Sequence, residues 1–137
     1  MNEDVLVPGW PTPKGYSNGR IGQGRILHTG GQIGWVAGEG GTMSFPASDL
    51  VGQFATTLDN ILAVVRAAGG QPTDIASMTV FVTDIPAYRL SQKALGAIWR
   101  ERLGRHFPAM ALVGVTQLVE PEALVEIQAV AYLGDAP

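Results

Sequence analysis

The sequence contains no cysteine and only two histidines among its 137 residues. Without cysteine, the chain forms no disulfide, carries no reactive thiol and offers no thiolate to a metal ion. The two histidines, His28 and His106, lie far apart along the chain, so neither belongs to a motif with metal-ligand spacing. The sequence therefore predicts no metal site.

Charged residues are also few, at 15% of the chain, and the net charge is −3. The densest basic stretch contains Arg100, Arg102, Arg105 and His106, and Glu101 interrupts it. We interpret this stretch as the solvated face of a helix, because nucleic-acid binding requires a larger phosphate-neutralising patch. No apolar run is long enough to cross a bilayer, and no secretory signal opens the sequence. We therefore expect a cytoplasmic protein with neither nucleic acid nor a membrane as its partner.

Apolar residues, by contrast, make up 46% of the chain, which excludes an intrinsically disordered protein. A chain of this length holds one domain with a proper hydrophobic core and little more. Because neither an internal repeat nor a linker divides the sequence, we expect residues 1–137 to fold as a single domain.

Two segments show the apolar spacing of amphipathic helices. Ser48 or Asp49 can cap the first helix, and the glycine pair that begins at Gly69 can end it. The second helix begins after Asp84, with a proline in its first turn, and stops at Gly104. Its apolar stripe comprises Tyr88, Leu95, Ile98, Trp99 and Leu103.

Alternating apolar residues predict strands at residues 25–33, 75–82, 109–115 and 123–133. The turn pair Asn18-Gly19 predicts a further hairpin near the start of the chain. Gly30-Gly31 predicts a bulge, or a place where another group approaches the backbone closely. The order of these elements favours an α+β fold, with a mixed β-sheet and two helices on one face.

The second face of this sheet lacks the polar character of a face exposed to water. Large apolar residues occur on both sides of several strands, as Val80 and Phe81 illustrate. Such a face marks an interface, so we expect a homo-oligomer; a sandwich or a further covering element is the alternative. Glu126, between Val125 and Ile127, points to this face, where it is paired, exposed or chemically active.

Several stretches, in order and with matching spacing, resemble the Rid/YjgF family of enamine and imine deaminases, once grouped as endoribonuclease L-PSP. Residues 15–17 are similar to the family's Pro-Tyr-Ser, and residues 29–33 to its Ser-Gly-Gln-Ile strand end. Residues 80–84 resemble its Val-Phe-Val-x-Asp strand. Residues 108–109 and 124–131 resemble its Pro-Ala-Arg and Val-Glu-Ile-Glu-Ala-x-Ala segments. The resemblance covers nearly the whole chain.

This resemblance implies a chorismate-mutase-like fold and a homotrimer whose small-molecule clefts lie between subunits. It also implies a hydrolase that acts on C–N bonds without a cofactor, releasing ammonia from enamines or imines. Matched position by position, the family pattern places Tyr16 at the cleft, the Gly31 backbone on the reacting group and Glu126 on the attacking water. Gln128 shares the face of Glu126, where it either assists by hydrogen bonding or packs at the interface.

One position departs from the family pattern, because Met110 replaces the arginine of Pro-Ala-Arg that binds the substrate carboxylate. Arginine grips a carboxylate with a bidentate fork, whereas a thioether offers soft apolar contact. The chain therefore resembles a branch that lacks this arginine, and a neutral or apolar imine suits Met110 better. Arg105 is a candidate replacement charge or a helix cap, and His106 is a candidate proton relay or a structural residue.

Met110 also favours an alternative function, a non-catalytic trimer of the same family that binds a small molecule. Ribonuclease activity, which the family's older label suggests, conflicts with the acidic chain and the absence of a basic groove. A partner-binding or chaperone-like role through exposed hydrophobic surface is a further alternative.

Overall fold

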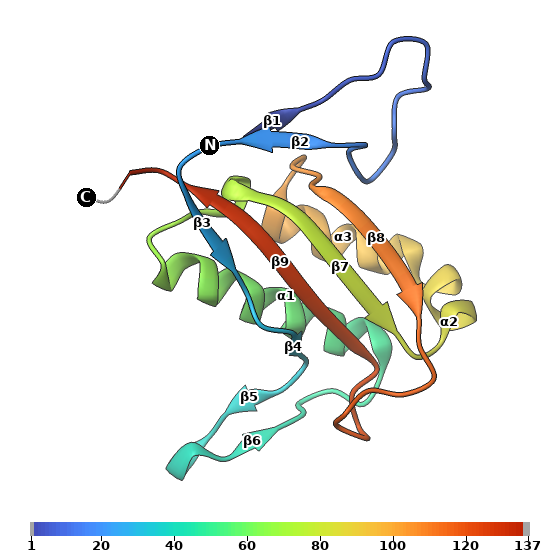
Figure 1. The fold of residues 1–137 in the computed structure, drawn as a ribbon. Helices are drawn as coiled ribbons and strands as arrows, with labels where there is room; N and C mark the ends of the chain where they lie inside the picture. The colour runs from blue at the N-terminus through green and yellow to red at the C-terminus, as the bar shows by residue number, and fades with distance from the viewer. Residues whose placement is uncertain (1, 136–137) are drawn as a thin grey trace.

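A mixed sheet of five strands forms the centre of the protein, for which the computed structural model describes residues 2–135 (Figure 1). The central strand β9 (Val125–Leu133) pairs antiparallel with β3 (Arg25–His28) and β4 (Gln32–Ile33) along one edge. Along its other edge it pairs antiparallel with β7 (Ile75–Val82), which in turn runs parallel to β8 (Ala109–Gly114). The strands predicted at residues 75–82, 109–115 and 123–133 are thus confirmed to within two residues.

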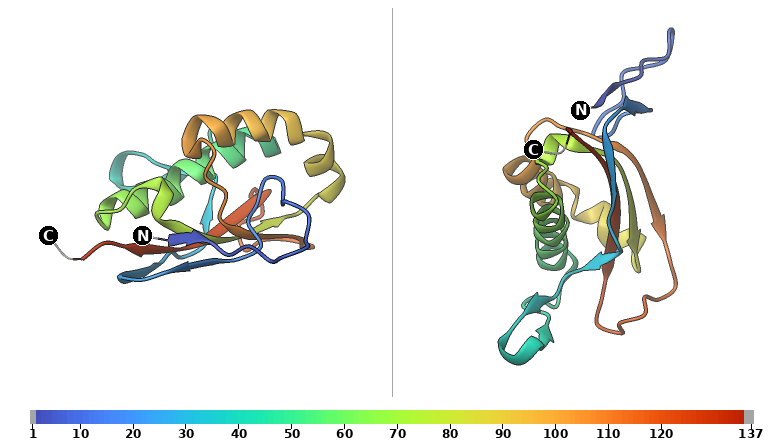
Figure 2. Two further views of the ribbon diagram at one scale, coloured as in Figure 1. Left: turned by 90° about the horizontal axis from the view of Figure 1, so that it is seen from above. Right: turned by 60° about the vertical axis from the view of Figure 1, so that its left-hand side comes forward.

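Three helices cover one face of this sheet (Figure 2). They are α1 (Leu50–Ala67), α2 (Ile85–Leu90) and α3 (Gln92–Leu103). The prediction of two helices is wrong, because the second segment breaks at Ser91, whose φ of −103° and ψ of 6° lie outside the helical range. Ser91 is the residue at which α2 ends and before which α3 has not begun, and it makes no side-chain cap hydrogen bond; apolar spacing does not detect such a break.

The core lies between the helices and the sheet. Every second residue of β9 from Val125 to Leu133 is buried against the helices, as the alternation predicted. In the parallel pair of β7 and β8, Met110 stands beside Met78, which is buried on the same side. The register of the sheet therefore turns Met110 toward the helices.

Two small hairpins project from the sheet (Figure 1). One pairs β1 (Asn2–Asp4) with β2 (Arg20–Gly22), and the other pairs β5 (Val36–Ala37) with β6 (Met43–Ser44). The hairpin predicted around Asn18-Gly19 is wrong, since neither residue has the positive φ that a tight hairpin turn requires. Residues 5–19 form a long connection instead.

The strand predicted at residues 25–33 is interrupted between β3 and β4. At this point the backbone N–H of Thr29 donates to the carbonyl of Ala129, at 2.9 Å. The hydroxyl of Thr29 accepts from the N–H of Ala129, also at 2.9 Å, and so replaces a backbone acceptor. The chain then passes Gly30 and Gly31 before the ladder to β9 resumes.

The sheet face opposite the helices is mixed in character. Ile26 and Val113 are exposed there, beside Phe81, Glu126 and Gln128. No helix among residues 2–135 is both long and apolar enough to cross a membrane.

Candidate functional site

Glu126 and Gly31, which the sequence predicted as site residues, lie against each other on the helix-free face of the sheet. Val125 and Ile127 are fully buried against the helices, so the alternation of β9 turns Glu126 to the opposite side. A Cβ built on Gly31 would lie 2.3 Å from Oε2 of Glu126 and 2.8 Å from its Cδ. The close approach predicted at the glycine pair is therefore made by this carboxylate.

The Glu126 carboxylate is available to a bound molecule. It has no hydrogen-bond or ion-pair partner among residues 2–135, and its side chain is half-buried. Gln128 follows two residues later on the same face, opposite Thr79, and is exposed. A carboxylate and a carboxamide thus point in one direction from β9.

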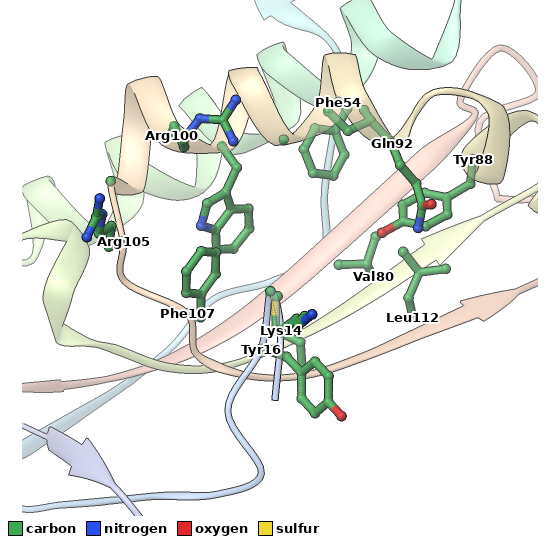
Figure 3. A pocket seen from close by; sticks show the side chains of 16 residues that line it. Lys14, Tyr16, Phe54, Val80, Tyr88, Gln92, Arg100, Arg105, Phe107 and Leu112 are labelled. Atoms are coloured by element: carbon green, nitrogen blue, oxygen red, sulfur yellow. The ribbon is translucent and has the colours of Figure 1, made fainter. Parts of the chain in front are cut away.

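Tyr16 and Met110, the other two predicted site residues, line a cavity of about 900 Å³ on the helix side of the sheet (Figure 3). The cavity lies between α3 and β8, and the segment that holds Tyr16 closes part of it. Its apolar walls are formed by Phe54, Val80, Leu95, Trp99, Phe107 and Leu112. Met110 therefore contacts a largely apolar space, as a thioether suits.

The five predicted site residues thus form two separate groups within one chain. Gly31, Glu126 and Gln128 do not line the cavity that contains Tyr16 and Met110. The sheet separates Met110, which faces the helices, from Glu126, which faces away. Tyr16 also borders a second hollow, which Ser77, Thr79 and Ala111 line.

Several residues of the cavity escaped sequence reasoning. Tyr88 lines it although its spacing placed it in the core stripe, and burial raises the pKa of its phenol above 10.0. Arg100 also lines it, although the sequence placed it on a solvated helix face, and so does Gln92, for which the sequence made no prediction. The one available signal was Gly96, a glycine inside an otherwise helical pattern, which marks a packing or functional site.

Arg105 and His106, the two further candidate residues, differ in whether they line the cavity. The exposed side chain of Arg105 lines the cavity and makes no hydrogen bond among the described residues, so it does not cap a helix. His106 does not line this cavity; its Nε2 lies 2.7 Å from the carbonyl oxygen of Ile75. Burial lowers the pKa of His106, and its own carbonyl accepts from Nε1 of Trp99 at 3.0 Å. His106 is therefore a structural residue.

Within residues 2–135, no group of three or more His, Cys, Asp or Glu side chains is arranged to hold a metal ion. The predicted site residues supply a carboxylate, a carboxamide, a phenol, a thioether and exposed backbone.

The fold and the site define a class of small α+β proteins with helices on one face of a mixed sheet and a carboxylate on the other. A family model described as endoribonuclease L-PSP matches residues 11–133. The chain belongs to this family, the Rid/YjgF family, as its sequence motifs indicated.

Named relatives support the same assignment along nearly the whole chain. A RutC family protein from Pyrococcus horikoshii is 29% identical over 132 residues, which are 96% of this chain and 98% of that protein. A protein from Escherichia coli named 2-iminobutanoate/2-iminopropanoate deaminase is 30% identical over 131 residues, again 96% and 98% of the two chains.

Solved structures of the family have the same fold. The Rid family protein YyfB from Yersinia pestis matches with a TM-score of 0.79 and 30% identity, over 96% of this chain and 98% of that one. Escherichia coli TdcF with bound serine matches with a TM-score of 0.67 and 29% identity, over 96% and 99%. The α+β prediction is therefore confirmed.

Proposed function

We propose that this protein is a hydrolytic deaminase that converts small enamines or imines into carbonyl compounds and ammonia. The observation that carries the proposal is the unpaired carboxylate of Glu126 held against the backbone of Gly31. The deaminase name of the Escherichia coli relative, at 30% identity, supports the same class of reaction.

The proposed reaction needs water, a base and a held substrate. After an enamine tautomerises to its imine, Glu126 accepts a proton from water as the oxygen attacks the imine carbon. Glu126 returns this proton to the nitrogen, which gives a carbinolamine. The hydroxyl proton is then transferred to the nitrogen, the C–N bond breaks, and ammonia leaves as the carbon–oxygen double bond forms. The exposed backbone of Gly31 holds the reacting group within reach of the carboxylate, which supplies the required proximity.

The proposed cleft lies between subunits of a homotrimer. Within one chain, Met110 faces the helices and Glu126 faces away from them, so a neighbouring copy would bring these two side chains to one cleft. The apolar side chains on the helix-free face, Ile26 among them, support such an assembly. Gln128, exposed beside Glu126, would contact the substrate or the neighbouring subunit.

Met110 shapes the proposed substrate. A thioether offers no charge-assisted hydrogen bond to a carboxylate, so the group in contact with Met110 is neutral or apolar. The same substitution favours the second candidate function, a trimer that binds a small molecule without converting it.

The proposal is tested by ammonia release from a panel of neutral and acidic imines generated in solution. Glu126→Gln should lower kcat/KM by at least about a hundredfold, because it removes the base and keeps the shape. Glu122→Gln is the matched control, since this glutamate is exposed and lies outside the site. The oligomeric state of each variant is measured by sedimentation.

The two candidate functions give different results in this assay. If Glu126→Gln retains full activity in an intact trimer, the catalytic role of Glu126 is wrong. If the wild-type protein binds imines or their carbonyl products and never releases ammonia, the non-catalytic candidate replaces the deaminase.

A further inference from the structure

The cavity between α3 and β8 combines an apolar interior with a cationic rim (Figure 3). Its volume of about 900 Å³ is that of a small-molecule site. Trp99 and Phe107 form a stacked wall, with ring centroids 6.1 Å apart and planes inclined by 7°. The hydrogen bond from Trp99 to the carbonyl of His106 fixes this wall. The interior therefore offers a rigid aromatic surface to a ligand.

A glycine opens this cavity from the helix side. Gly96 lies in the middle of α3, where glycine is the poorest helix former apart from proline. A Cβ placed on Gly96 would meet only Nη1 of Arg100, at 3.8 Å, among atoms beyond its own helical backbone. The space above Gly96 is thus empty, and the guanidinium of Arg100 lies at its edge.

The charges around the cavity are all of one sign. Lys14, Arg100 and Arg105 line it, and no aspartate or glutamate does. None of the three cations has a hydrogen-bond or ion-pair partner among residues 2–135. Three cations with no acidic side chain among the residues that line the cavity make the potential at its rim positive, which favours an anionic ligand.

We propose that this cavity binds an amphipathic carboxylate, a molecule with an aromatic or branched apolar body and one acidic head. The body packs on the wall of Trp99 and Phe107, and the head bonds to Arg100 and Arg105. Figure 3 shows these two arginines toward one end of the cavity, and Tyr88 and Gln92 toward the other. A polar substituent at the far end of the ligand meets the phenol and the carboxamide.

This assignment goes beyond the deaminase proposal and does not require it. Glu126 lies on the other side of the sheet from the cavity, so binding here is measurable whether or not the protein turns over an imine. The cavity and the proposed cleft nevertheless share Tyr16 and Met110. A ligand in the cavity therefore borders the apolar part of the proposed cleft.

The test is calorimetric titration of the full-length protein with three probes, phenylpropionate, phenylpropionamide and propionate. Phenylpropionate should bind, and the neutral amide and the short acid should each bind at least about tenfold more weakly. The first comparison isolates the charge, and the second isolates the apolar body. If the amide binds as well as the acid, the cationic rim does not select the ligand and the proposal fails.

Gly96→Leu tests the location of the site. The leucine side chain fills the space above Gly96, so binding of phenylpropionate should fall at least about tenfold, while leucine's better helix propensity preserves the fold. Circular dichroism and thermal unfolding verify that the variant is folded. Unchanged binding by folded Gly96→Leu would overturn the location.

A second set of variants tests the cations separately from the cavity. Replacing Arg100 and Arg105 together by Gln should weaken phenylpropionate about tenfold to a hundredfold and leave the amide unaffected. Arg66→Gln, an exposed arginine on α1 outside the cavity, is the matched control and should bind like wild type. Equal binding by the double variant and Arg66→Gln would contradict the proposal.

Discussion

The carboxylate of Glu126 occupies the space that a side chain on Gly31 would fill. A Cβ on Gly31 would lie 2.3 Å from Oε2, 2.8 Å from Cδ and 3.1 Å from Cγ of Glu126, which is closer than atoms approach without moving. The two residues belong to segments about a hundred positions apart, and the pairing of β4 with β9 brings them together. Glycine at position 31 therefore determines where the carboxylate sits.

Gly31→Ala should displace the carboxylate and lower the proposed deaminase activity. A shift of about 1 Å in a catalytic group costs about a hundredfold in rate, so kcat/KM should fall by tenfold to a hundredfold. Stability should change little, because Glu126 is half-buried and its end is flexible. Gly30→Ala is the control, since a Cβ on Gly30 meets nothing within 4 Å. Equal activity of the two variants would show that the carboxylate position does not matter.

The sequence predicted the strands of the centre well because burial leaves a strong pattern there. The strand β7 has the predicted bounds, and its alternation from Ile75 to Val82 matches its buried face. The same alternation in β9 is enough to predict that Glu126 lies on the face away from the helices. The turn pair Asn18-Gly19 predicted a hairpin that does not form, because contacts between distant segments determine the structure there. The neighbouring Arg20 bonds to Asn2 and Asp4, and β2 pairs with β1.

The site was only partly predictable for the same reason. Glu126 and Gly31 lie in stretches that resemble family motifs. The cavity, by contrast, is assembled from the segment of Lys14, all three helices, the α3–β8 connection, β7 and β8. Nothing in the spacing of these segments shows that they enclose a space. The sequence predicted that Met110 departs from the family pattern, but only the register of β7 with β8 shows that it faces the helices.

Gln53 is a buried polar residue of α1 whose side chain bonds to three backbone groups. The apolar spacing of α1 did not predict this role. Its Nε2 donates to the carbonyls of Ala47 and Glu122, at 3.2 and 2.9 Å, and its Oε1 accepts from the N–H of Leu124 at 2.8 Å. Gln53→Leu leaves these backbone groups unsatisfied, so the free energy of unfolding should fall by about 2–4 kcal/mol.

Denaturant unfolding measures this change. Gln23→Leu, an exposed glutamine in the loop after β2, is the control and should lie within about 0.5 kcal/mol of wild type. A Gln53→Leu variant as stable as that control would show that the three bonds do not hold the loop before β9.

Ser17 presents the opposite case, a buried hydroxyl without a partner. The residue is 6% exposed, and its Oγ makes no hydrogen bond among the described residues, although its backbone N–H donates to the carbonyl of Pro108 at 3.0 Å. Ser17→Ala removes the unsatisfied group and keeps the backbone bond. We expect unchanged stability or a gain of up to about 1 kcal/mol in thermal or denaturant unfolding.

Thr57→Val is the matched comparison for Ser17→Ala. The Thr57 hydroxyl is fully buried and donates to the carbonyl of Gln53 at 2.7 Å, so its removal should cost about 1 kcal/mol. If Ser17→Ala destabilises the protein as much as Thr57→Val does, the Ser17 hydroxyl has a partner in solution, and the assignment of an unsatisfied group is wrong.

His106 links stability to pH through a neutral imidazole. Burial lowers its pKa below the ordinary 6.5, and the hydrogen bond to the carbonyl of Ile75 opposes this shift without cancelling it. Because the pKa in the folded state is lower, the unfolded state binds the proton first as the pH falls. Neutral His106 therefore contributes fully to the free energy of unfolding above pH 6.5. This contribution is lost as the pH falls from 6.5 through the lowered pKa of the folded state.

His106→Gln replaces the imidazole with a group that does not titrate and whose amide N–H can still donate toward Ile75. Wild type should exceed this variant in free energy of unfolding by the largest margin near pH 8, and the margin should shrink toward about pH 5. Denaturant unfolding of both proteins at several pH values gives the difference between their free energies of unfolding. The titration of all other groups is common to both proteins and cancels in this difference. A margin that stays constant, or widens as the pH falls, would mean that the folded protein does not favour neutral His106. Because the carbonyl of His106 also holds Trp99, the near-ultraviolet circular dichroism of folded wild type should change only as the pH falls through the lowered pKa of His106.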